Sequence, residues 1–120
     1  VNDLEVLSKT GQLPTAKISI RYKDKDHQSE ARGDGAVDAI FNAIEKLINS
    51  ETKLQLYSVN AVTEGTDSQG EVTVRLKKDG RIINGQGADT DILLASAKAY
   101  VNALTLMRNP GRLHPQLGGV

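Results

Sequence analysis

The chain has 120 residues, 15 Lys and Arg balanced by 15 Asp and Glu, and no cysteine. The length suits one domain with a real core, the zero net charge excludes a general attraction to nucleic acid or anionic membranes, and the absence of thiols excludes disulfides and cysteine metal sites. No apolar run approaches the roughly 18 residues of a membrane span. We therefore expect a cytoplasmic domain with no membrane partner, beginning at Val1 as a piece of a longer protein.

The first half of the chain alternates between strand and helix patterns. The predicted elements are a short strand at 4–7, a half-buried strand at 15–23, a polar turn at 24–28, a weak strand at 29–32, a Gly-Asp-Gly corner at 33–35 and an amphipathic helix at 36–48.

The second half predicts a similar series. It contains an extended segment at 54–62, a polar turn at 64–70, a strand at 71–77, a hairpin at Asp79-Gly80, a returning strand at 81–86, a Gly-Gln-Gly corner at 85–87, a helix at 91–107 capped by Asp89 or Thr90, and a flexible tail at 109–120. In the extended segment, simple alternation places Leu54, Leu56 and Ser58 on one side and Tyr57 and Val59 on the other.

The two halves read as copies of one plan. The strand at 17–23 matches 71–77 at a spacing of 54 residues, and the glycines at 33 and 35 match those at 85 and 87 at a spacing of 52. Because each copy is too small to bury a core, the two must pack on each other. We expect repeats at about 4–49 and 53–107 within one domain at 1–108.

Catalytic groups are scarce. His27 falls in the predicted turn and His114 in the tail, which indicates solvated side chains, and no catalytic or metal-binding residue is predicted. The glycine corners precede helices whose free amides suit a small carboxylate, although glycine could instead serve only to close a tight turn. Tyr57 could line a small pocket or be an ordinary half-buried strand residue.

Three runs carry a resemblance to a known family: GDGAVDAIFNAI, LQLYSVNAVTEGTDSQGEVTVRL and GQGADTDILLASAKAYVNAL. They resemble the C-terminal regulatory (LeuA allosteric) domain of 2-isopropylmalate synthase, a family shared with citramalate synthase. The resemblance implies an α+β fold of two βββα units related by a pseudo-two-fold axis, and a homodimer that binds an amino acid near its interface. The implied ligand-binding residues are Gly33, Asp34, Gly35, Ala36, Val37, Leu54, Tyr57, Ala61, Ser68, Gly70, Ala88 and Thr90.

The resemblance also implies a function. This domain, not itself an enzyme and without a cofactor, would bind L-leucine and inhibit a catalytic TIM barrel in the same polypeptide, which condenses acetyl-CoA with 2-oxoisovalerate and holds a divalent metal. L-isoleucine sensing for citramalate synthase is the alternative. From another class, the αβββα order over 36–107 fits a double-stranded RNA-binding module, but the acidic start of the last helix, at 88–91, would repel phosphates. A small stand-alone enzyme is a third reading, which the missing acid and base disfavour.

Overall fold

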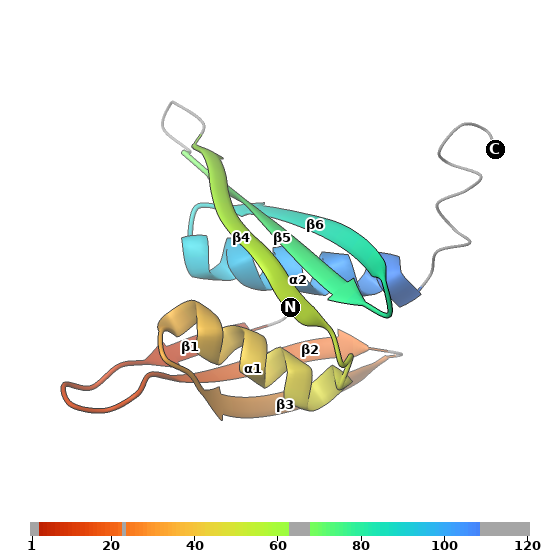
Figure 1. Cartoon of the computed structure of the whole chain (residues 1–120). Helices are drawn as coiled ribbons and strands as arrows, with labels where there is room; N and C mark the ends of the chain where they lie inside the picture. The colour runs from red at the N-terminus through yellow and green to blue at the C-terminus, as the bar shows by residue number, and fades with distance from the viewer. Residues whose placement is uncertain (1–2, 23, 63–67, 109–120) are drawn as a thin grey trace.

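The chain folds into two βββα units. The computed structural model describes residues 3–22, 24–62 and 68–108, and their side chains except those of Tyr22, Ala61, Val62 and Arg108. Two antiparallel three-stranded sheets, ordered β1-β2-β3 and β4-β5-β6, are each followed by a helix, as predicted (Figure 1). The elements are β1 Asp3–Leu7, β2 Thr15–Tyr22, β3 Lys25–Arg32, α1 Ala36–Ile48, β4 Lys53–Val62, β5 Gly70–Lys78, β6 Arg81–Asp89 and α2 Ile92–Arg108.

The helices form the inner layers of the molecule. α1 packs on β2 and β3, α2 packs on β5 and β6, and the two helices contact each other. Figure 1 shows that both helices run in the same direction, so their N-terminal ends lie on the same side of the molecule. None of the described helices is long and apolar enough to cross a bilayer. The predicted tail at 109–120 lies outside the described residues.

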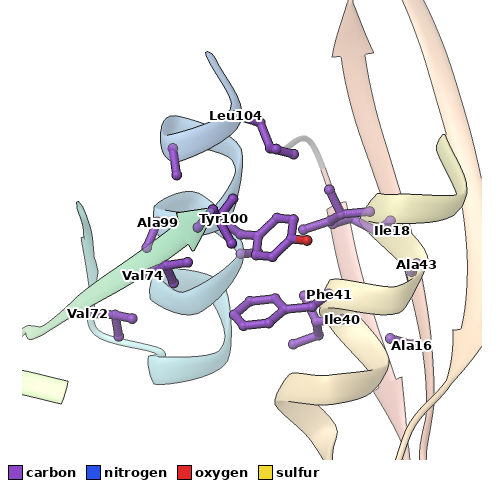
Figure 2. Close-up of a cluster of buried hydrophobic side chains, with 14 of the residues drawn as sticks. Ala16, Ile18, Ile40, Phe41, Ala43, Val72, Val74, Ala99, Tyr100 and Leu104 are labelled. Carbon is purple, nitrogen blue, oxygen red and sulfur yellow. The ribbon is translucent and has the colours of Figure 1, made fainter. Parts of the chain in front are cut away.

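The core is shared between the two units. Alternating residues of β2 and β5 are buried under the helices, and the stacked rings of Phe41 and Tyr100, with centroids 4.4 Å apart, join α1 to α2 (Figure 2). An offset ring stack contributes about 0.5–1.5 kcal/mol beyond the area it buries. Either unit alone would leave its inner helix face exposed to water. Buried strand positions are Ala16, Ile18, Ile20, Val72, Val74 and Leu76.

One spacing relates the two units from the β2 and β5 strands to the helices, and the spacings predicted from the sequence were wrong. The hairpin that pairs Tyr22 with Lys25 corresponds to the hairpin that pairs Lys78 with Arg81, a spacing of 56 residues (78 minus 22). The side chains of a strand alternate with a period of two residues, so shifting the alignment by two residues gives the same pattern. The pattern therefore could not distinguish a spacing of 54 residues from one of 56.

Hydrogen bonds from the helices repeat this spacing. On α1, Lys46 Nζ donates to the Glu30 carbonyl at 2.9 Å, and on α2, Asn102 Nδ2 donates to the Gln86 carbonyl at 2.6 Å. Both donor and acceptor positions again differ by 56 (102 minus 46, 86 minus 30). The helices are therefore held to their sheets by equivalent bonds. A second set is Asn42 Nδ2 to the Arg32 carbonyl (2.8 Å) and Lys98 Nζ to the Ala88 carbonyl (3.5 Å).

The second predicted glycine corner is not a corner. Gly85 and Gly87 lie inside β6, where a Cβ on Gly85 would overlap the carbonyl oxygen of Ala99 on α2. The missing side chains let α2 lie directly on the strand, and the small residues of α2 contribute to the same close approach. The corner at 33–35 therefore has no glycine counterpart in the second unit, and the pairing of the two corners was wrong.

The first hairpin is tighter than predicted. β3 begins at Lys25, so the polar turn expected at 24–28 is wrong and His27 lies in a strand opposite Ile20. Asp24 adopts a φ of 61°, a left-handed conformation that aspartate tolerates and that closes a short turn. The hairpin predicted at Asp79-Gly80 is confirmed, with φ values of 51° and 80°.

Candidate functional site

The start of α1 is an uncovered helix N-terminus. Gly35 is the N-cap residue, has extended backbone, makes no side-chain cap bond, and has open space where a Cβ would be. The first helical bond runs from the Ala39 N–H to the Gly35 carbonyl at 2.9 Å, so the amides of Ala36 and Val37 precede the ladder. The Asp38 carboxylate accepts the Asp34 N–H at 2.9 Å. This end of α1 can offer backbone donors to an anion.

Gly33, the other glycine of the same corner, has a structural role. It is buried, its N–H donates to the Pro14 carbonyl at 3.2 Å, and a Cβ there would overlap the backbone of Asp38 and Ala39. Only glycine allows the chain to pass so close to the first turn of α1. Of the two glycines, Gly35 is the one that leaves space for a ligand.

The start of α2 is filled by its own carboxylates. Asp91 Oδ1 accepts the Leu93 N–H at 2.9 Å, so Asp91 is the cap, not Asp89 or Thr90 as predicted. Asp89 Oδ1 accepts the Asp91 N–H at 2.9 Å, and its Oδ2 meets Lys98 Nζ at 2.8 Å. The Asp91 N–H and then Lys98 lower the pKa of Asp89. The two helix starts therefore differ in which N–H group is bonded: Asp91 accepts an amide of α2 itself, whereas Asp38 accepts the N–H of Asp34, which precedes α1.

Three predicted ligand residues lie near this acidic end. Thr90 and Ala88 are exposed, and Gly70, the first residue of β5, pairs with Asp89 and is buried. A Cβ on Gly70 would overlap the Ile92 side chain, so this glycine lets β5 approach the first turn of α2. Ser68, which precedes β5, is exposed.

Tyr57 connects β4 to both helices. Its ring lies edge-on to Phe41 with centroids 6.0 Å apart, and its hydroxyl lies 2.7 Å from Ser96 Oγ on α2. Ser96 is fully buried and donates its one hydroxyl proton to the Ile92 carbonyl at 2.8 Å. Tyr57 must therefore be the donor to Ser96. The predicted site residue is half-buried at the junction of the two units.

Bulges in β4 change which residues share a face. The register shifts between Leu54 and Leu56, so Leu54 pairs with Leu76 while Tyr57 pairs with Val74. Both partners are buried under α2, which places Leu54 on the same face as Tyr57 and corrects the predicted alternation. The same face carries Val59, opposite Val72, which the sequence analysis did not assign to the site. Leu54 and Val59 are 48% and 47% exposed.

Ala61, the last predicted site residue on this strand, pairs with Glu71 through its backbone. Its side chain lies outside the described residues.

A polar cluster that the sequence did not predict lies between the units. The Tyr100 hydroxyl donates to Glu45 Oε1 at 2.8 Å, and burial followed by the Glu45 contact raises the pKa of Tyr100. Tyr100 and Phe41 lie within the two helices that the sequence predicted. No sequence signal connects Glu45 to a residue 55 positions away.

Two cavities lie away from the predicted ligand residues. One of about 530 Å³ adjoins the connection between β1 and β2, with Leu7 and Leu13 in its wall. Another of about 350 Å³ lies between the units, at the C-terminal ends of both helices. Neither is lined by a predicted ligand-binding residue. The candidate groups are therefore the open start of α1 and the face of β4 that carries Leu54, Tyr57 and Val59.

Comparison with known proteins identifies the family. The model of the LeuA allosteric (dimerisation) domain matches residues 1–107. The chain belongs to this family. The LeuA allosteric domain described here is 56% identical over 118 residues to a 2-isopropylmalate synthase of Methylococcus capsulatus, which covers 98% of the chain and 23% of that protein. It is 59% identical over 111 residues to the 2-isopropylmalate synthase of Nitrosospira multiformis, covering 92% of the chain and 22% of that protein. The chain spans less than a quarter of the length of these relatives.

Proposed function

We propose that this LeuA allosteric domain is the leucine-sensing regulatory module of a 2-isopropylmalate synthase. In this proposal, L-leucine binds where two copies of the domain meet and lowers the activity of a metal-dependent TIM barrel in the same polypeptide, which condenses acetyl-CoA with 2-oxoisovalerate. The observation that carries the proposal is the identity of 56–59% to 2-isopropylmalate synthases over more than nine tenths of the chain. A coupling free energy of about 1–3 kcal/mol between the two sites would suffice for feedback.

The difference between the helix starts supports one orientation of the ligand. The amides of Ala36 and Val37, next to the open Gly35, would bind the leucine carboxylate, since a helix N-terminus favours anions. The Asp34 carboxylate or backbone carbonyls would accept from the ammonium group. The start of α2 has fewer free amides to offer, because Asp89 and Asp91 already accept the N–H groups of Asp91 and Leu93.

The exposed face of β4 would bind the branched side chain. Leu54 and Tyr57 share that face with Val59, and the half-exposed side chains of Leu54 and Val59 offer apolar surface to a leucyl group. The remaining residues implied by the resemblance stay predictions, and two of them, Gly33 and Gly70, are buried and could act only by shaping the backbone around the site. The remaining residues are Gly33, Ala61, Ser68, Gly70, Ala88 and Thr90.

A second copy of the domain would close the site. β4 is an edge strand, and Leu54, Leu56 and Val59 are exposed along it. Long apolar edge strands are normally covered in native proteins. A homodimer formed over β4 would cover these side chains and place the ligand between two copies.

Two alternatives are less well supported. An isoleucine sensor of citramalate synthase remains the nearest rival, and the relatives named above favour leucine. A double-stranded RNA-binding module would need α1 and α2 on the sheet that separates them in sequence. Here α1 packs on β2 and β3, so 36–107 is not one such layered unit.

Parallel calorimetric titrations with leucine, isoleucine and valine test the proposal. A heat of binding with leucine alone supports the proposal, and one with isoleucine alone indicates a domain of citramalate synthase instead. If none of the three amino acids gives a heat of binding, the sensor proposal is wrong. Tyr57→Ala should weaken leucine binding at least about tenfold, equivalent to about 1.4 kcal/mol. Ile82→Ala is the matched control, since it removes apolar surface that is 54% exposed on another strand and should leave the affinity unchanged.

A further inference from the structure

We propose that Glu45 is a positioning residue for the ligand site: its carboxylate clamps the two units together at the C-terminal end of α1 and thereby sets the geometry of β4 against α1. This inference rests on the leucine-binding function proposed above. It assigns a role in that function to a residue that contacts none of the proposed ligand groups.

Three segments meet at the Glu45 carboxylate. Glu45 belongs to the last turns of α1, Ser50 lies in the connection between α1 and β4, and Tyr100 lies on α2. Glu45 Oε2 accepts the Ser50 N–H at 3.1 Å, the Ser50 hydroxyl bonds to Oε1, and the Tyr100 hydroxyl donates to the same Oε1 at 2.8 Å. Hydrogen bonds to a charged group are stronger than those between neutral groups. One carboxylate therefore joins the first unit, the connection and the second unit.

The connection itself is strained. Asn49 and Glu51 have φ values of 51° and 59°, and neither is glycine. Asn49 is the C-cap of α1, where a left-handed residue is common, but Glu51 gains no such benefit. Such conformations are unfavourable for non-glycine residues and persist where surrounding contacts determine them. Here the contacts come from Ser50, whose hydroxyl also lies 2.9 Å from the Thr52 hydroxyl.

Packed side chains lead from the clamp to the site. Tyr100 stacks on Phe41, and Figure 2 shows the two rings facing each other between the helices. Phe41 in turn contacts the edge of Tyr57, which is bonded to Ser96. A change in the position of Tyr100 would therefore move Tyr57 relative to the start of α1. Loss of the clamp would lower the fraction of molecules in which both halves of the site are correctly placed, and the apparent affinity would fall in proportion.

Tyr100→Phe tests the inference most cleanly, because it keeps the ring stack and removes only the hydroxyl, which donates to Glu45 and also interacts with the Thr52 and Ser50 side chains. In the 120-residue chain, at a temperature where every variant is folded, we expect the Kd for leucine to rise by about 5- to 20-fold. Glu45→Gln keeps an acceptor for the Tyr100 hydroxyl. Its Kd for leucine should therefore lie between those of wild type and Glu45→Ala. Lys46→Met is the matched control: it removes a bond from α1 to β3 within one unit, and it should leave the Kd unchanged.

A merely structural role would give a different result. If Tyr100→Phe and Glu45→Ala lower the melting temperature but bind leucine as tightly as wild type, the inference is wrong. If wild type binds no leucine, backbone chemical shifts of Tyr100→Phe decide instead. Changes that extend to Tyr57, Val59 and Ala36 would still support a clamp that sets the site geometry, whereas changes confined to residues around 45–52 and 100 would overturn it.

Discussion

Gly85→Ala should destabilise the domain because the added methyl group has no room. A Cβ at this position would overlap the carbonyl oxygen of Ala99 and the backbone nitrogen and Cβ of Ala103, so α2 would have to move away from β6. Overpacking of this kind costs about 1–3 kcal/mol. At about 4 °C per kcal/mol for a domain of this size, the melting temperature should fall by about 4–12 °C.

Gly35→Ala is the matched control for this experiment. Its φ of −142° suits any residue, and no atom lies within 4 Å of the position of the new Cβ. The gain from a less flexible unfolded chain and the loss of a preferred N-cap residue oppose each other, so the net change should stay within about 1 kcal/mol. Circular-dichroism melts and urea titrations of both variants provide the measurement. A Gly85→Ala protein that melts within about 2 °C of wild type and yet loses leucine binding would show that Gly85 serves a ligand rather than helix packing.

Three further predictions concern the junction and the start of α2. Asp91→Ala should lower the free energy of unfolding by about 0.5–2 kcal/mol, because it removes the helix cap. In the same urea titrations, Thr90→Ala should leave the free energy of unfolding almost unchanged. Tyr57→Phe should cost about 0.5–1.5 kcal/mol through loss of its bond to Ser96, and an equal loss in Ser58→Ala would argue against that bond as the cause. Because the pKa of Asp89 is lowered in the folded state, its contribution is present at neutral pH and is lost as the pH falls below about 4. Asp89→Asn should therefore show a shallower loss of stability between about pH 5 and pH 3, and an unchanged acid profile would contradict this assignment.

Local sequence patterns predicted most elements well. The helix at Ala36–Ile48 has its predicted bounds, and the hairpin at Asp79-Gly80 has the positive φ values that such a pair favours. These features depend on neighbouring residues, through helical spacing and turn chemistry. The turn near Asp24 was predicted too wide, because a polar run does not indicate which of its residues continue the strand.

The candidate site was predicted only in part. The resemblance supplied Gly35, Leu54 and Tyr57, but simple alternation separated Leu54 from Tyr57, and neither line of reasoning assigned Val59 to the site. A bulge inserts an extra residue that leaves no mark in the hydrophobic pattern. The cap Asp91 was missed for a similar reason, since Asp89, Thr90 and Asp91 are all chemically able to cap a helix.

The sequence by itself determined that the chain forms two strand-rich repeats, each closed by a helix, because periodicity and turn residues act over short distances. Only the tertiary structure decided that the repeats are 56 residues apart (78 minus 22), that Gly85 serves the contact with α2, and that Glu45 joins both units. The physical reason is that these relations depend on the fit between surfaces distant in sequence. Several alignments of the two repeats satisfy the same local pattern. Steric overlap and hydrogen bonding in the folded chain allow only one of these alignments.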